Sequence, residues 1–206
     1  MIIPMTLRGR LHPLVAAVML LAGCAHTDPA RFYTLSATAQ RPSSGQVAAR
    51  PSVIVAPVQV AAYLDRPQVI ARLGESELQL AEFDRWAEPL ADGISRVLAE
   101  NLSRLLPSQS ISDRQPTGPE HVDFRVSVSV TRFDQAGGKE VLLRAHWSVF
   151  GGNGKDLIAH RLSAVQVAIE GKDVASAVYA QSRALGKLSE EIAAVIKAAP
   201  AGGGAG

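Results

Sequence analysis

Cys24 is the only cysteine in the 206-residue sequence, and it directly follows Leu21-Ala22-Gly23. A lone cysteine has no partner for an internal disulfide, and an odd cysteine in a secreted chain needs another role. Its thiol is the one nucleophile near this position that could form a thioether to a diacylglycerol. The small residues before it suit the cleft of a peptidase. We therefore predict that the chain is cut before Cys24 and lipidated there.

The residues before Cys24 have the order of charges and apolar residues expected of a secretory signal. Arg8 and Arg10 precede the apolar run at residues 14–21. That run is too short to cross a hydrocarbon layer of roughly 30 Å. Together with Leu-Ala-Gly-Cys at 21–24, it matches the bacterial lipobox. The alternatives are a plain secretory signal or a short anchor with an incidental cysteine.

The lipobox divides the chain into functional segments. We expect a cleaved lipoprotein signal peptide at 1–23 and a tether at 24–30. Two or three acyl chains on Cys24 hold a protein firmly on a bilayer, whereas one chain binds reversibly. The anchored domain then faces the periplasm. Ala25, in place of an aspartate, favours the outer membrane over the inner membrane.

The rest of the sequence lacks a recognisable catalytic or metal-binding motif. The run Gly151-Gly152-Asn153-Gly154-Lys155-Asp156 resembles a phosphate loop only in part, because Val149 and Asp156 replace the required glycine and hydroxyl residue. We interpret it as a hairpin turn. Three histidines have no metal-ligand spacing, namely His121, His146 and His160. We predict a protein that is not an enzyme, with no cofactor except the covalent lipid on Cys24.

Composition gives no case for nucleic-acid binding. The net charge is only +2, and part of that excess lies in the first twelve residues. No basic stripe with interleaved aromatic residues is present. The hydrophobic content of 47% is that of a globular domain.

Two further strings resemble a known family. One is Tyr63-Leu64-Asp65-Arg66-Pro67, and the other is Arg85-Trp86-Ala87-Glu88-Pro89-Leu90. With the lipobox and the early Phe32-Tyr33-Thr34-Leu35, they resemble the ABC-type transport auxiliary lipoprotein family over most of residues 31–196. We call residues 63–67 the LDRP string and residues 85–90 the RWAEPL string.

The resemblance implies a role and a set of partners. Proteins of this family are non-catalytic parts of lipid-transport systems linked to envelope integrity. An MCE-domain protein forms a tube across the periplasm there, and the lipoprotein sits at its outer-membrane end. Because such tubes are symmetric rings, we expect a homo-oligomer, with a ring as the simplest match. A structural or assembly lipoprotein of another outer-membrane machine is the alternative, and a lipid-anchored enzyme is a third.

Both strings also have a structural interpretation. Pro67 forces Arg66 into an extended conformation, so Asp65-Arg66-Pro67 predicts a turn. Trp86 at a helix entry is typical of a core anchor. Partner contact is the other interpretation, and its candidate residues are Tyr63, Asp65, Arg66, Arg85 and Trp86. Arg85 and Glu88 are close enough in sequence to pair.

Hydrophobic periodicity predicts a meander of three strands. Residues 122–131 alternate apolar and polar side chains, and 141–149 and 157–169 follow after glycine-rich turns. Turns this short join antiparallel strands. The polar side of this sheet either faces water or binds a partner. Its members are Asp123, Arg125, Ser127, Ser129 and Thr131, with Arg144 and His146 beside them.

Other strands are expected at 31–36, at 52–60 with Pro57 marking an edge or bulge, around 63–72, and at 77–80. Two helices complete the prediction. One begins at Glu88-Pro89 and ends before Pro107, and the other follows a cap at Asp173. The sequence thus predicts a single mixed α/β domain at 31–197, with a largely antiparallel sheet flanked by two long helices. Residues 198–206 are expected to form a flexible Gly/Ala tail.

Overall fold

The computed structural model describes residues 29–40, 51–106, 110–113, 122–151 and 154–199. The expected signal segment, Cys24, most of the tether and most of the tail lie outside these residues. The strands are β1 (Arg31–Tyr33), β2 (Ser52–Val55), β3 (Gln59–Val60), β4 (Gln68–Arg72), β5 (Leu78–Trp86), β6 (Ser110–Ser112), β7 (Phe124–Ala136), β8 (Glu140–Gly151) and β9 (Asp156–Ala168). The helices are α2 (Leu90–Leu105) and α3 (Val174–Ala198).

The predicted meander is confirmed as β7, β8 and β9, which pair antiparallel in chain order. Gly151 pairs with Asp156 across the β8–β9 connection, so the glycine-rich run does join the two strands of a hairpin. The apolar positions of the alternation are buried on one face of this sheet. They are Phe124, Val126, Val128, Val130, Val141, Leu143, Ala145, Trp147 and Val149.

The remaining strands extend the sheet from β7. The described strands form one nine-stranded sheet in the order β1-β5-β4-β7-β2-β6, with β3 also on β7 and β8 and β9 on the far side of β7. β2, β3 and β4 all run parallel to β7. Pro57 falls in the break between β2 and β3, because proline cannot donate to the ladder. This break lies inside the sheet, since β2 pairs with both β6 and β7.

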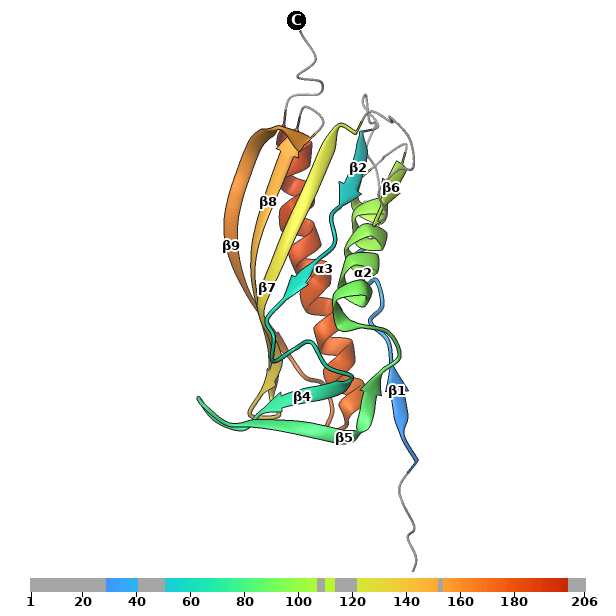
Figure 1. The fold of residues 1–206 in the computed structure, drawn as a ribbon, viewed down its shortest axis with the longest axis vertical. Coiled ribbons are helices and arrows are strands. Elements are labelled where there is room, and N and C mark those ends of the chain that lie inside the picture. Colours follow the sequence, from blue (N-terminus) through green and yellow to red (C-terminus); the bar gives the residue numbers. More distant parts are fainter. Residues whose placement is uncertain (1–28, 41–50, 107–109, 114–121, 152–153, 200–206) are drawn as a thin grey trace, which may run out of the picture.

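Both helices lie against the apolar face (Figure 1). α3 packs on β7, β8 and β9, and α2 packs on β2, β3, β6 and α3. Asp173 caps α3 by accepting a hydrogen bond from the Ser176 amide, as predicted. Pro89 precedes α2 at the N-cap position. The mixed α/β fold with a largely antiparallel sheet and two long helices is therefore confirmed.

The segment from residue 63 to 86 differs most from the prediction. Residues 62–64 form a turn rather than an extended chain, and β5 continues to Trp86 instead of ending near residue 80. β5 has little apolar alternation because most of its first half is exposed. Its pairing with β4 shifts register between Gln68 and Ile70, and its end pairs with β1 as well. Figure 1 shows the β4–β5 hairpin lying crosswise at one end of the elongated molecule.

A candidate partner-binding groove

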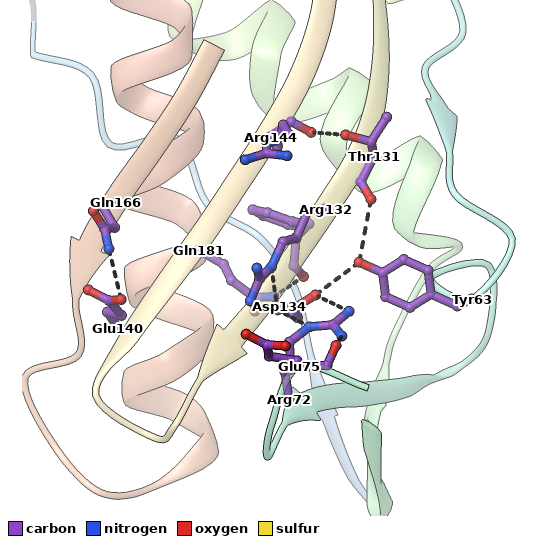
Figure 2. A network of polar contacts seen from close by, with 11 residues as sticks. Tyr63, Arg72, Glu75, Thr131, Arg132, Asp134, Glu140, Arg144, Gln166 and Gln181 are labelled. Carbon is purple, nitrogen blue, oxygen red and sulfur yellow. Dashed lines mark hydrogen bonds and ion pairs between the residues drawn. The ribbon is translucent and has the colours of Figure 1, made fainter. Parts of the chain in front are cut away.

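A buried carboxylate, Asp134, lies at the centre of a polar network between β4 and β7 (Figure 2). It accepts a hydrogen bond from the Tyr63 hydroxyl at 2.9 Å and from Arg132 Nε at 3.0 Å. Arg72 Nε and Nη2 lie 3.3 and 3.4 Å from its two oxygens. A fully buried charge is tolerated only when it is paired and hydrogen-bonded in this way. The network thus ties the turn at residue 63 and the end of β4 to β7.

Tyr63 belongs to this internal network as well as to the LDRP string. Burial raises the pKa of its phenol, and the hydrogen bond to Asp134 raises that pKa further. Arg72 lies over the Tyr63 ring, with its guanidinium carbon 5.7 Å from the ring centre. The phenol therefore stays protonated and donating at neutral pH. Its contribution to stability is complete below about pH 10 and is lost as pH rises through the raised pKa.

The turn after Tyr63 presents Asp65 and Arg66 to solvent. The Leu64 amide donates to the Ala61 carbonyl at 2.8 Å, and Leu64 itself is buried. The Arg66 amide donates to the Leu64 carbonyl at 2.9 Å. The hydrogen-bonded turn therefore lies at residues 62–64, just before the predicted Asp65-Arg66-Pro67, where the chain only bends at 66–67. Buried Leu64 and the hydrogen bond of Tyr63 to Asp134 hold it in place.

The RWAEPL string meets this turn at the end of β5. The Trp86 amide donates to the Pro67 carbonyl at 2.7 Å, and the Trp86 side chain is in the core with 7% exposure. The core-anchor interpretation of Trp86 is thus confirmed. Arg85 points into solvent, and its Nε reaches only the Glu82 carbonyl at 3.4 Å.

The expected pairing of Arg85 with Glu88 is wrong. Glu88 pairs instead with Arg96 from the second turn of α2, at 2.5 Å. The reason is geometric: Arg85 leaves the exposed side of β5, whereas Glu88 lies at the start of α2, facing Arg96. Arg96 also binds Glu100 at 3.1 Å and the Leu35 carbonyl at 3.0 Å. The hydrogen bond that Arg96 donates to Glu88 is the main reason that the pKa of Arg96 is raised.

The two strings line one hollow of about 380 Å³. Its apolar lining comes from both segments, and the charged side chains are Asp65, Arg66 and Glu88. The residues that line it are Asp65, Arg66, Pro67, Trp86, Ala87, Glu88, Pro89 and Leu90.

A second hollow of about 570 Å³ shares Ala87 and Glu88 with the first. It runs between α2 and the segment after β1. Arg96 and Glu100 line it, and so does Arg104, which donates to the Ala37 carbonyl at 2.7 Å. We call the two hollows together the groove.

The wall of the groove at residues 34–39 is fixed by both helices. Asn101 of α2 accepts hydrogen bonds from the amides of Thr38 and Ala39, at 3.0 and 2.9 Å. Thr38 in turn donates to the Ser182 carbonyl of α3 at 3.2 Å. Gly186 permits this approach, since a Cβ there would lie 2.5 Å from the Thr38 hydroxyl. The groove is therefore bounded by rigid elements on this side.

The described residues hold no group of three His, Cys, Asp or Glu side chains that could bind a metal ion. His146 and His160 do stack across β8 and β9, with ring centres 6.2 Å apart, and Ser148 bonds to His160 at 2.9 Å. Both histidines are exposed on the sheet face away from the helices. His121 lies outside the described residues. No helix in the part of the chain that is described is both long and apolar enough to span a membrane.

The sequence interpretation missed Asp134 and its arginines. A signal was present, because the alternation of residues 122–130 skips one position before Phe133. The structure has a register shift there, between Val130 and Arg132. After the shift Phe133 enters the core, and Asp134 falls on the opposite face beside Arg132. A polar residue beyond a broken alternation was therefore a candidate for a local network.

Comparison with known proteins gives a family and a fold. Residues 33–193 match the model of the ABC-type transport auxiliary lipoprotein component family. A crystal structure of an uncharacterised protein is 21% identical, with a TM-score of 0.67, and the match covers 82% of this chain and 99% of that chain. The Xanthomonas campestris protein XCC0632, of family DUF330, is 18% identical with a TM-score of 0.65, over 82% and 96% of the two chains. No curated protein matches the sequence significantly.

Proposed function

This chain belongs to the ABC-type transport auxiliary lipoprotein component family, and we propose that it is the lipid-anchored, non-catalytic accessory subunit of an MCE-type lipid transport system. In this proposal the lipid on Cys24 holds the domain at the periplasmic face of the outer membrane. The domain binds the MCE-domain protein of the same system and thereby supports envelope integrity.

One observation carries the proposed binding role. The LDRP and RWAEPL strings are separated in sequence by β4 and most of β5, yet they line a single hollow. Core packing explains Leu64 and Trp86, which are buried. It does not explain Asp65, Arg66 and Arg85, which are exposed around that meeting point. The two strings thus form one concave surface that carries exposed charges. Such a surface suits a binding site for another protein.

The chemistry of the groove suits an extended polypeptide segment of the partner. Pro67 and Pro89 are exposed and offer apolar contact, while Asp65 and Arg66 add exposed charges to the lining. Arginine is enriched at protein interfaces, where it adds hydrogen bonds as well as charge. A lipid-anchored domain is already concentrated at its membrane, so individually weak contacts are sufficient.

Charge reversal at Arg66 tests this proposal. We expect Arg66→Glu to reduce co-purification of the MCE-domain protein by roughly tenfold while the melting temperature stays unchanged. Lys187→Glu is the matched control, because Lys187 is exposed on α3 and does not line the groove.

A third variant tests the other candidate surface. Arg144 is exposed on the polar face of the sheet, away from the helices. If Arg144→Glu abolishes capture while Arg66→Glu does not, the sheet face is the interface and the groove proposal is wrong. Capture of the components of a different outer-membrane assembly, with no MCE-domain protein among them, would favour the assembly-lipoprotein alternative.

A further inference from the structure

Large apolar side chains are exposed at the end of the molecule where β1 begins. Phe32 on β1 is 65% exposed, and the β4–β5 hairpin exposes Leu73, Leu78 and Leu80 to 55%, 36% and 43%. Leu73 lies in the turn of that hairpin, where its amide donates to the Glu77 carbonyl at 3.1 Å. Single exposed leucines are common, but apolar side chains gathered on one surface usually have a partner.

The hairpin forms a base across one end of the long molecule. Figure 1 shows β4 and β5 running crosswise there, with the start of β1 beside them and the end of α3 at the opposite end. Leu78 and Leu80 point to the same side of β5, because side chains two residues apart share a face. We call Phe32, Leu73, Leu78 and Leu80 the apolar base.

The proposed anchor would hold this base close to a bilayer. At up to about 3.6 Å per residue, the segment from Cys24 to Pro29 reaches no further than about 18 Å. β1 begins two residues after Pro29, and Phe32 is its second residue. A lipid on Cys24 therefore limits how far Phe32 can lie from the membrane surface.

We propose that the apolar base is a second membrane contact, which inserts into the interface of the same bilayer that holds the lipid on Cys24. This inference rests on the proposed lipidation. The leucines are flanked by exposed Glu75, Glu77 and Glu82, with Arg85 further along β5. Most of these charges are acidic, so they do not attract anionic lipid headgroups. The proposed contact is therefore apolar and does not require anionic lipid.

Two contacts with the bilayer fix the orientation of the domain. A single flexible tether leaves the long axis of the domain free to tilt. An inserted hairpin that lies crosswise to this axis would keep the axis upright on the membrane. The opposite end of the molecule, where α3 ends, then points into the periplasm. The groove beside β1 and α2 is presented at a constant height to a partner that arrives from the opposite membrane.

Tryptophan probes in the full lipidated protein test the proposal. Leu80→Trp and Phe32→Trp place indoles in the base, and Leu162→Trp is the matched control on β9, where Leu162 is 55% exposed. The native Trp86 and Trp147 are buried and give a constant background. The protein is reconstituted in phosphatidylcholine vesicles with brominated acyl chains, which quench only indoles that enter the bilayer. Phe32→Trp is a conservative change at an exposed site, so folding is preserved even where Leu80→Trp is not tolerated.

We expect the fluorescence of both base variants to fall in brominated vesicles and that of Leu162→Trp to stay unchanged. Vesicle flotation is measured separately and reports on the lipid anchor. If the protein floats but neither base probe is quenched by bromine, the base stands off the membrane and the inference is wrong while the anchor holds. Base probes shielded from both bromine and aqueous acrylamide would show that copies of the chain cover the base, which also overturns it. A wild-type chain that does not float, and behaves like Cys24→Ser, overturns the anchor and this inference together.

Discussion

Asp134 has no exposed surface and is surrounded by a phenol and two guanidinium groups. The side chains of Arg72 and Arg132 are 18% and 30% exposed, so the network lies at the edge of the core. Its role is positional, because each donor belongs to a different part of the chain. Without the carboxylate, Tyr63 would lose its 2.9 Å hydrogen bond and keep the longer one, from its hydroxyl to the Thr131 carbonyl at 3.5 Å, so the turn that carries Asp65 and Arg66 would be held less firmly.

Replacing Asp134 by asparagine should destabilise the protein strongly. Asp134→Asn keeps the shape of the side chain but removes the charge that pairs with Arg72 and Arg132. Breaking a buried ion pair from one side costs about 3–5 kcal/mol, and the partial exposure of the arginines places the expected loss near 3 kcal/mol. Urea unfolding measures this free energy.

Asp65→Asn is the matched control, since Asp65 is exposed on the adjacent turn. Its unfolding free energy should stay within about 0.5 kcal/mol of wild type. Equal stability of the two variants would show that the Asp134 network does not contribute to folding.

Sequence patterns predicted individual core residues better than individual surface contacts. Trp86 was expected in the core and is there, because a large aromatic ring has few stable alternatives. The pairing of Arg85 with Glu88 was wrong, since the partner of Glu88 depends on where α2 brings Arg96. The candidates Asp65 and Arg66 are exposed, whereas Tyr63 is engaged by Asp134.

At the scale of elements, α2 follows its hydrophobic periodicity closely. Its apolar positions at helical spacing are all buried, and Leu98 and Leu102 have no exposed surface. In α3 the apolar positions at helical spacing are buried along the middle of the helix, at Val178, Leu185, Leu188 and Ile192, whereas Val174 and Val195 near its ends are half-buried. Gln181 lies in the buried stripe because its amide donates to the Phe133 carbonyl at 3.1 Å, beside the register shift in β7.

Truncating Leu98 should reveal how much the helix stripe stabilises the fold. Leu98→Ala leaves a cavity between α2 and the sheet and should cost roughly 2–5 kcal/mol. Thermal or urea unfolding measures the loss. Leu157→Ala removes the same atoms from a site that is 60% exposed, so its cost should be about 0.5 kcal/mol or less. A shift for Leu98→Ala no larger than that of this control would contradict the assigned packing.

The β4–β5 hairpin could not be predicted from periodicity, in contrast to the meander. In the meander one face meets the helices, so burial imposes alternation on β8 and on β7 up to its register shift after Val130. In β5 the first half is mostly exposed, and the end of the strand lies between β1 and β4 and pairs with both. Its position therefore depends on non-local contacts with β1 and β4, which leave no regular pattern in the sequence.

At the scale of the whole molecule, exposed apolar side chains form a second group far from the base. Leu157, Ile158 and Leu162 lie in the first half of β9, which is exposed along most of its length. Among the described strands β9 pairs only with β8, so its other edge has free backbone donors and acceptors. Proteins that stay monomeric usually protect such an edge with proline, bulges or charge.

This open edge predicts contact between copies of the chain. On the opposite side of β7 the sheet ends at β6 along one branch and at β1 along the other, so the two sides of the sheet differ. A head-to-tail contact between different surfaces repeats around an axis and closes into a ring when the rotation allows it. A ring of this kind would match the symmetry expected of a tubular partner. We therefore expect the protein to be a homo-oligomer in detergent, with its mass measured by light scattering or native mass spectrometry.

Leu157→Lys should lower that mass to the mass of one chain, because a charge on an edge strand opposes strand pairing. Leu78→Lys is the matched control, since it introduces the same charge in the apolar base, which faces the membrane in our proposal. That control should keep the oligomeric mass and weaken vesicle contact instead. If Leu78→Lys dissociates the oligomer while Leu157→Lys does not, the assignments of the two apolar surfaces must be exchanged. A wild-type chain that is monomeric at every concentration would contradict the ring and leave the groove to bind its partner one copy at a time.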